Sequence, residues 1–303
     1  MKRLLLLIIA LCLALPAGAL GYSPPAHEFD HTFGGFGYVL LPDGSAEIRS
    51  YHGRDTTLAI PDRLDGHAVA AIGRNAFARN EVVKTIILPE GVRRIGQDAF
   101  RHCSALETVV LPASLTEVDG NPFIESARLT TIIAHERSPF TVANGVLIHH
   151  GDQRLICCPE GLTQTRLVIP DGVRVIGENA FRGNATVAEI IFPASLRAID
   201  SFAFTMCSRP TSVTLPEGLQ EIGPYAFCGC DALTEVILPE TLTLIDECAF
   251  QSMSALERIV IPEGVTTIGW SAFGYCEHLA DVTLPASLTE MDDEAFRGCP
   301  FSP

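Results

Sequence analysis

The sequence predicts a repeat solenoid with short parallel β-strands along one wall, because two anchors recur along it in one register. The first anchor is a phenylalanine, and seven of its eight intervals are 23 residues long. The second is an apolar residue followed by proline, which keeps the same step. A 23-residue unit is too short to bury its own apolar face, so each must stack on the next. The phenylalanines are Phe77, Phe100, Phe123, Phe181, Phe204, Phe227, Phe250, Phe273 and Phe296, and the proline anchors begin at Leu88, Leu111, Ile169, Phe192, Leu215, Leu238, Ile261 and Leu284.

Residues 1–19 are typical of an export signal. Lys2 and Arg3 precede an apolar run from Leu4 to Leu15, and Ala17-Gly18-Ala19 supplies a small-residue cleavage site. The run of 12 residues is shorter than the roughly 20 that a membrane-spanning helix needs. We therefore expect a signal peptide, and a secreted or cell-surface protein with no integral membrane segment after cleavage.

The unit from Leu215 to Leu238, LPEGLQEIGPYAFCGCDALTEVIL, illustrates how one turn is built. Apolar residues at Leu233, Val236 and Leu238 suit a short strand with one buried face, which Pro239 ends because proline cannot donate to a ladder. Leu219 and Ile222 begin the return side of the turn. Successive turns should then lie about 4.8 Å apart, with the phenylalanines stacked inside.

The pattern LxxVxLPxxLxxIGxxAFxxC, which covers about Leu58 to Cys299, resembles the BspA-type leucine-rich repeat of bacterial surface and secreted proteins. The resemblance implies a leucine-rich repeat fold and a role in surface-associated adhesion or host contact. The segment from Phe36 to Gly73 is also similar to the family's N-terminal cap. Its residues agree, because Tyr38 to Leu41 and Ala46 to Arg49 flank Asp43-Gly44, which is a hairpin signal.

An inserted β-hairpin interrupts the repeat. The interval from Phe123 to Phe181 is 58 residues, which exceeds one repeat by 35. Within it, Val142 to Ile148 surround Asn144-Gly145, and a turn at His149 to Asp152 leads to Leu155 to Cys158. The expected organisation is a signal peptide at 1–19, a linker and cap at 20–57, and a solenoid at 58–303 with the hairpin at about 134–168.

Two positions five residues apart alternate in kind from one turn to the next. Glycine pairs such as Gly218 and Gly223 alternate with hydroxyl and aspartate pairs such as Ser195 and Asp200. We expect the second position to be a left-handed turn, and the aspartate to accept a hydrogen bond from the hydroxyl of its own turn. Calcium binding by the aspartates is disfavoured, because alternate turns lie on the order of 10 Å apart.

The remaining chemical residues predict no catalytic, cofactor or metal site. Periodic cysteines indicate a ladder of buried free thiols, although disulfides would suit an exported protein. Cys228 and Cys248 could form a disulfide only if their Cα atoms lay within about 7 Å of each other. The adjacent Cys157 and Cys158 do not form the CxxC motif of a redox site. Adjacent His149 and His150 are expected in solvent on the hairpin turn, since no further ligand at metal spacing completes a set. HExxH, GxSxG and phosphate-loop motifs are absent. The periodic cysteines are Cys103, Cys207, Cys230, Cys276 and Cys299.

The charge excludes two classes of partner. The chain has 36 acidic and 21 basic residues, a net charge of −15, and removal of the signal leaves 36 against 19, or −17. Nucleic acid and anionic membranes both require basic surfaces.

Two outward columns of the predicted strands form the candidate partner-binding surface, because residues that alternate with the buried ones face solvent. An exposed aliphatic row often marks a protein-binding surface, although β-branched residues also suit an open sheet face. The first column is Ile87, Val110, Ile133, Ile191, Thr214, Ile237, Val260 and Thr283. The second is Thr85, Thr108, Thr131, Glu189, Ser212, Glu235, Arg258 and Asp281.

The function expected from these observations is a non-enzymatic exported scaffold for protein binding, with a host extracellular or envelope protein as its ligand. A carbohydrate-binding or envelope-structural module is the alternative. Trp270 is the sole tryptophan, and it could provide an aromatic surface for a sugar ring. A secreted hydrolase is a third class, for which no residue set is present. The open last turn also predicts self-association through Val282 to Leu284.

Overall fold

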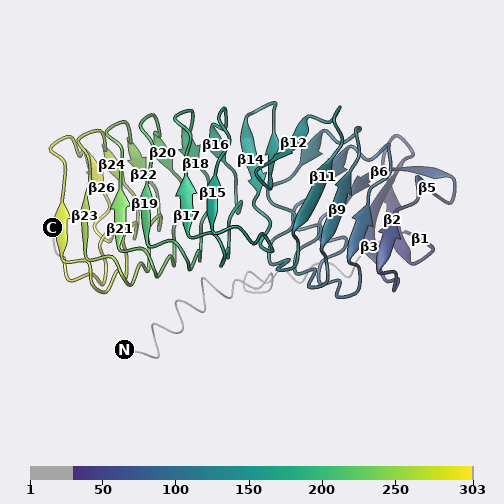
Figure 1. Cartoon of the computed structure of the whole chain (residues 1–303), viewed down its shortest axis with the longest axis horizontal. Helices are drawn as coiled ribbons and strands as arrows, with labels where there is room; N and C mark the ends of the chain where they lie inside the picture. Colours follow the sequence, from purple (N-terminus) through teal and green to yellow (C-terminus); the bar gives the residue numbers. More distant parts are fainter. Residues whose placement is uncertain (1–29, 302–303) are drawn as a thin grey trace.

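The computed structural model describes residues 30–301 and is a β-solenoid of about 11 turns that repeat at about 23 residues. Figure 1 shows the turns stacked from an N-terminal cap to the C-terminal strands, and the described range contains no helix. The predicted fold class is confirmed. The predicted signal at 1–19 lies outside the described residues. Over residues 30–301, the search for a helix long and apolar enough to cross a membrane finds none.

The front ladder, formed by the strands that precede the proline anchors, is the wall predicted from the sequence. Its strands are parallel, and Thr108 pairs with Thr85 on one side and with Thr131 on the other. The strands group into one four-stranded sheet and three two-stranded sheets. They are β4 (Thr57–Ala59), β7 (Thr85–Ile87), β9 (Thr108–Leu111), β11 (Thr131–Ala134), β15 (Arg166–Val168), β17 (Glu189–Ile191), β19 (Ser212–Thr214), β21 (Glu235–Ile237), β23 (Arg258–Val260) and β25 (Asp281–Thr283).

A return ladder, which the sequence pattern did not predict, runs along the other side of each turn. Most of its strands have two residues, of which one is outward and the other is buried, completely in Ile95 and Ile222 and partly in Val118 and Met291. Register again follows the repeat, so that Ile199 pairs with Ile222. The strands are β6 (His67–Ile72), β8 (Arg94–Ile95), β10 (Glu117–Val118), β14 (Arg154–Cys157), β16 (Val175–Ile176), β18 (Ala198–Ile199), β20 (Glu221–Ile222), β22 (Leu244–Ile245), β24 (Thr267–Ile268) and β26 (Glu290–Met291).

The cap is an antiparallel hairpin, as predicted. It comprises β1 (His31–Phe33), β2 (Phe36–Leu40) and β3 (Ala46–Tyr51), and β3 then pairs in parallel with β6 of the return ladder. A short strand β5 (Arg63–Leu64) pairs with the start of β6. The ring of Tyr51 lies 5.6 Å from that of Phe77, so the cap continues the aromatic stack of the repeats.

The repeat phenylalanines form two internal stacks. Phe77, Phe100 and Phe123 stack with ring centroids 5.2 and 5.4 Å apart. The second stack runs from Phe181 to Phe296 at 4.7 to 5.3 Å. The preceding alanines are buried, which explains why this position stays small.

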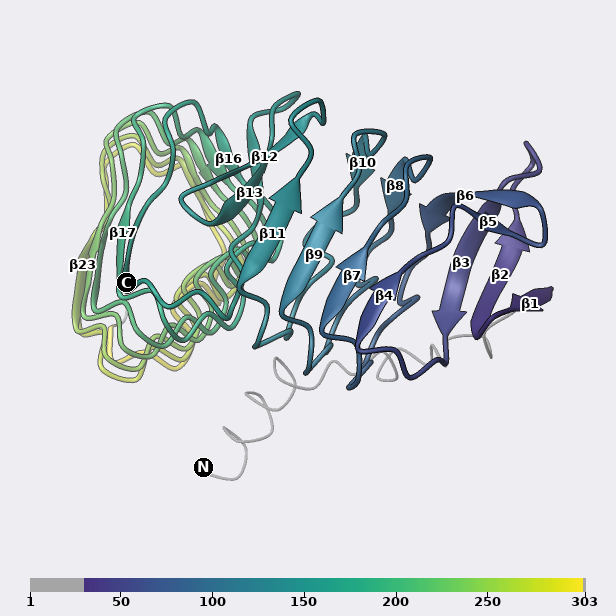
Figure 2. The same cartoon turned by 45° about the vertical axis from the view of Figure 1, so that its right-hand side comes forward.

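The inserted segment forms three antiparallel strands between the two stacks, here called the inserted sheet, which begin a nine-stranded sheet that continues as the C-terminal return ladder. It comprises β12 (Phe140–Ala143), β13 (Val146–His149) and β14, with the predicted Asn144-Gly145 turn at φ 53° and 85°. Its two faces enter different cores, because Leu147 and Ile156 pack in the N-terminal core whereas Ile148 and Leu155 pack in the C-terminal one. Figure 2 shows the later turns end on but the earlier ones from the side, so the stack changes direction here.

The alternating pairs have a different basis from the one expected. The Thr241 hydroxyl accepts the Gly218 N–H at 2.8 Å and donates to the Leu219 carbonyl at 2.8 Å, both in the preceding turn. Ser114 and Ser195 bond in the same way, and neither contacts the aspartate of its own turn. The expected hydroxyl-to-aspartate bond is therefore wrong.

The expectation of a left-handed turn at the second position is also wrong. Gly218 at the first position has a φ of 104°, whereas Asp200 and Gly223 at the second position have ordinary backbones. Left-handed residues instead follow two positions later, at Phe202 and Tyr225. The second glycine allows close stacking, because a Cβ at Gly96 would lie 2.7 Å from a backbone nitrogen of the preceding turn.

Candidate functional site

The first outward column lies on the solvent face of the front ladder. The side chains of Ile87, Ile133, Ile237 and Val260 are 38%, 49%, 48% and 58% exposed. Val110 and Ile191 are half-buried, and Thr214 and Thr283 are exposed. The aliphatic row thus reaches solvent in both halves of the molecule.

The second column changes character along the solenoid. Its first three members, Thr85, Thr108 and Thr131, are uncharged threonines. The later members are exposed and mostly charged, and the Glu189 carboxylate pairs with the guanidinium of Arg166 at 3.1 Å. They are Glu189, Ser212, Glu235, Arg258 and Asp281. The C-terminal half of the surface therefore combines aliphatic residues with charged residues of both signs, with a small excess of carboxylates.

The structure adds residues to both columns. In the first column, Val168, which is 41% exposed, pairs with Ile191, and Ala59 pairs with Ile87. In the second column, Arg166 pairs with Glu189, and Thr57 pairs with Thr85. The phenylalanine intervals did not indicate these residues. The proline anchors do indicate that Val168 belongs to the column, because Val168 directly precedes Ile169-Pro170 just as Ile87 directly precedes Leu88-Pro89.

The inserted sheet divides the surface into two parts. The strands β11 and β15 on either side of the insertion belong to different sheets, and the strands from β15 onward form three two-stranded sheets. At the division, the Asn144 side chain donates to the Val168 carbonyl at 2.8 Å, so the inserted turn covers the edge of β15. The columns do not form one uninterrupted row.

The periodic cysteines form the predicted ladder of free thiols. Each thiol donates to the carbonyl of the phenylalanine one turn earlier, as from Cys207 to Phe181 at 3.2 Å. Cys103 and Cys230 are buried, and burial raises the pKa of the Cys103 thiol to about 12. Cys157 and Cys158 are also buried, one in each core. These thiols stabilise the interior.

A charged network occupies the end of the inserted sheet. The His149 Nδ1–H donates to the Asp152 carboxylate at 2.7 Å and the ring packs against Phe140, which corrects the expectation that His149 is solvated, whereas His150 is exposed. The Arg154 guanidinium joins Asp152, at 3.0 Å, to Asp200. Within the described range, no three histidine, cysteine, aspartate or glutamate side chains are grouped to hold a metal ion.

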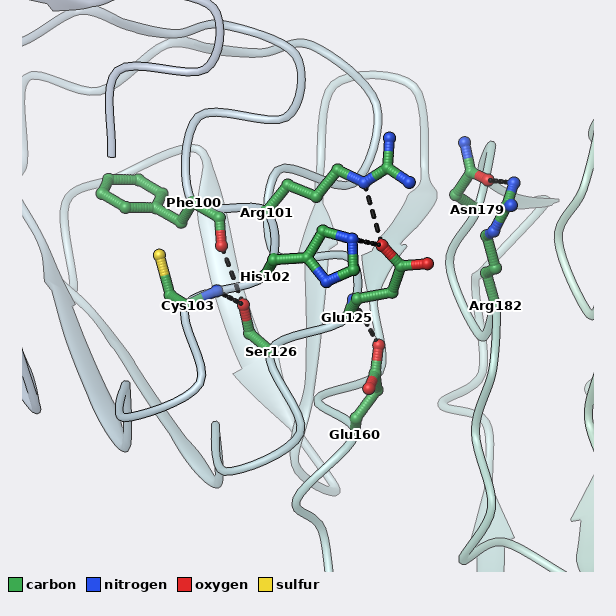
Figure 3. Close-up of polar contacts among 9 residues, drawn as sticks. All are labelled: Phe100, Arg101, His102, Cys103, Glu125, Ser126, Glu160, Asn179 and Arg182. Carbon is green, nitrogen blue, oxygen red and sulfur yellow. Dashed lines mark hydrogen bonds and ion pairs between the residues drawn. The ribbon is translucent and has the colours of Figure 1, made fainter. Parts of the chain in front are cut away.

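A second polar cluster lies where the turn containing Phe123 meets the segment after the inserted sheet (Figure 3). The Glu125 carboxylate accepts from Arg101 at 2.9 Å and contacts the His102 ring at 2.6 Å. The Glu125 N–H donates to the Glu160 carboxylate at 2.6 Å. Burial first, and the neighbouring Glu125 charge next, raise the pKa of Glu160 to about 7.

This cluster replaces a missing backbone contact. Elsewhere the N–H two residues after each phenylalanine donates to a carbonyl of the next turn, as from Arg79 to Arg101 at 2.8 Å. Glu125 holds this position but is followed by the insertion, so the Glu160 side chain supplies the acceptor. Sequence reasoning singled out neither glutamate, because their roles exist only where a turn is absent.

Comparison with known proteins gives one family and several solved structures. The model of the BspA type leucine rich repeat region matches residues 67–145 and 174–302 with 6 copies. A leucine-rich repeat protein from Eubacterium ventriosum is 17% identical, with a TM-score of 0.62 over 89% of this chain and 94% of that one. A leucine rich cell surface protein from Faecalibacterium prausnitzii is 22% identical, with a TM-score of 0.47 over 89% and 92%. No curated protein matches.

Proposed function

Because the chain belongs to the BspA-type leucine-rich repeat family, we propose that it is a non-enzymatic exported scaffold that binds other proteins through the outward face of its front ladder. Members of this family share the leucine-rich repeat scaffold. The proposal of export relies on the signal sequence predicted at 1–19. The proposal of a role in adhesion or host contact relies on the family resemblance. The expected location is the cell surface or the extracellular medium.

The observation that carries this proposal is the exposed aliphatic row. Ile87, Ile133, Val168, Ile237 and Val260 are each more than a third exposed although they belong to regular strands. Removal of such groups from water is the main favourable term in protein association. The open sheet face offers many of them at a regular spacing, which suits an extended protein ligand.

The charged residues of the second column limit which proteins the C-terminal part of the surface can bind. Glu189, Glu235 and Asp281 flank the aliphatic residues there, and the basic residues of that column are Arg258 and Arg166, which is paired with Glu189. Complementary charge speeds association and excludes partners of like charge. A host extracellular or envelope protein with basic groups beside an apolar strip fits this face.

The test replaces Ile191, Ile237 and Val260 together by threonine. Threonine already occupies positions 214 and 283 of this column, so the strands should form unchanged. Proteins captured from host extracellular matrix and from the producer's envelope are compared between the native chain and the variant. We expect the variant to bind its captured partner at least tenfold more weakly, since about three aliphatic contacts are lost.

The matched control is the double variant Val175→Thr and Leu244→Thr. These half-buried residues face outward on the return ladder. The control should retain native affinity if the front ladder is the binding face. Equal affinity of the triple variant and the native chain, with an intact fold, would contradict the proposal.

A carbohydrate-binding or envelope-structural role is the second candidate. Trp270 is 44% exposed, which suits stacking on a sugar ring. A glycan array that binds the native chain but not Trp270→Ala would favour this role over protein binding. Self-association through Val282 to Leu284 stays a prediction, and a constant monomer mass in light scattering across a wide concentration range would contradict it.

A further inference from the structure

A cavity of about 310 Å³ lies where the inserted sheet interrupts the return ladder. The strand β10 ends one run of this ladder and β14 belongs to the next, so no strand pairs across the gap. Val118, Phe140 and Ile156 provide apolar lining, and the other lining residues are mainly charged. The cavity lies at the lower end of the size range of small-ligand sites, and its lining is more polar than is usual for them.

The charges that line the cavity are unbalanced. Four carboxylates, those of Glu117, Asp152, Glu178 and Asp200, line it together with one guanidinium, that of Arg154. Arg154 is already paired with both aspartates. The cavity therefore has an excess of negative charge.

Glu178 is the one of these four carboxylates that has no ion-pair partner in the described structure. Its side chain accepts a hydrogen bond from Asn179 at 3.1 Å, and it makes no ion pair within 4.0 Å in the described structure. Burial raises its pKa, and the charges of Asp98 and Asp200 add to that effect, whereas the Asn179 hydrogen bond and the charge of Arg154 oppose it in part. Glu117, at the rim, lies 3.9 Å from Arg94, which is itself bonded to Asp119. A cation placed between Glu117 and Glu178 would meet two incompletely compensated charges.

We propose that this cavity binds an organic cation, a guanidinium or ammonium group on a short alkyl stem. The charged head lies between Glu178 and Glu117, and the stem packs on Phe140, Val118 and Ile156. A planar guanidinium fits best, because it can donate to two carboxylates at once. The carboxylates surround a space larger than a metal ion, and in the described range they form no metal-binding group.

The site is independent of the protein-binding face proposed above. It lies on the return ladder and the inserted sheet, whereas that face lies on the front ladder. The triple threonine variant should therefore bind the organic cation normally, and loss of this site should leave capture by the front ladder unchanged. The two proposals can fail separately.

The test is calorimetric titration of the full chain with butylguanidinium, with butylurea as its neutral isostere. We expect saturable binding of butylguanidinium in the micromolar to millimolar range, and at least tenfold weaker binding of butylurea. Glu178→Gln should weaken binding about tenfold, and so should raising NaCl to about 0.5 M. Glu221→Gln is the matched control, because this exposed residue occupies the return ladder away from the cavity.

A capped Gly-Arg-Gly peptide distinguishes the two sources of such a cation. Binding as tight as that of butylguanidinium indicates an arginine side chain of a protein partner, and binding of the free cation alone indicates a small-molecule ligand. The proposal is overturned if butylguanidinium shows no saturable binding, if butylurea binds equally, or if Glu178→Gln binds like the native chain. Circular dichroism of each variant confirms the fold, and Glu117→Gln provides a second variant at the rim.

Discussion

At the scale of single residues, side chains at the junction replace hydrogen bonds that backbone carbonyls accept in regular turns. The Phe123 N–H donates to the Asn121 side chain at 3.0 Å, whereas the Phe100 N–H reaches a carbonyl of the next turn. The same asparagine donates to the Asn179 carbonyl at 2.9 Å, across the insertion. Asn121 and Glu160 thus join the two halves of the chain.

The raised pKa of Glu160 predicts a pH-dependent stability. The usual pKa of this group is near 4.5 and the folded value is about 7, so the protonated form is favoured by the fold. Its contribution, on the order of 3 kcal/mol, is fully present below pH about 4.5 and is lost as the pH rises through about 7. Glu160→Gln keeps the acceptor for Glu125 and removes the charge, so it should be more stable than the native chain at pH 8 and equally stable at pH 4.

Urea unfolding at several pH values measures this difference. Glu257→Gln, which removes an exposed carboxylate, is the control and should change stability little at any pH. Parallel stability curves for Glu160→Gln and the native chain from pH 4 to pH 8 would show that Glu160 titrates normally.

At the scale of the element, the hydroxyl contacts join turns in pairs. Thr241 bonds two backbone groups of the preceding turn, at Gly218 and Leu219. The adjoining glutamates add to this contact, since Glu90 accepts from the N–H groups of Ala113 and Ser114 in the next turn. Those bonds lower the pKa of Glu90. The two-turn alternation of the sequence therefore reflects a two-turn unit of the structure.

Removal of one such contact should cost a measurable part of the stability. Thr241→Val keeps the shape but removes both hydrogen bonds, so the free energy of unfolding should fall by about 1 to 2 kcal/mol. Thr214→Val is the matched control on an exposed strand position and should be nearly neutral. Thermal and urea unfolding of both variants provide the measurement, and equal stabilities would show that the hydroxyl contributes nothing net.

The sequence predicted the elements that repeat and missed those that depend on partners far along the chain. Phe227 and Pro239 mark their turn because an internal ring and a strand end each demand a particular side chain. The hydroxyl of Thr241 was misassigned because its partners lie 23 and 22 residues earlier, which no local pattern reveals. The cavity beside Glu178 was missed because it results from an absent turn.

At the scale of the whole molecule, the inserted sheet divides one solenoid into two cores. Alternate residues of β13 face opposite cores, and β14 places Leu155 in one core and Ile156 and Cys157 in the other, so the sheet belongs to both. In a repeat protein, stability is approximately the sum of each turn and its contacts with neighbouring turns. The inserted sheet is the element whose buried residues belong to both described cores.

This division predicts that damage to one core stays within it. Phe250→Ala should cost about 3 to 5 kcal/mol and lower hydrogen-exchange protection in the turns from Phe181 to Phe296. Amides of β8 and β9, in the N-terminal core, should keep their protection. Phe100→Ala is the reciprocal variant, with the opposite expected distribution. Native-state hydrogen exchange measures both, and an equal loss of protection in the two cores after either substitution would mean that the inserted sheet transmits unfolding and the solenoid is one cooperative unit.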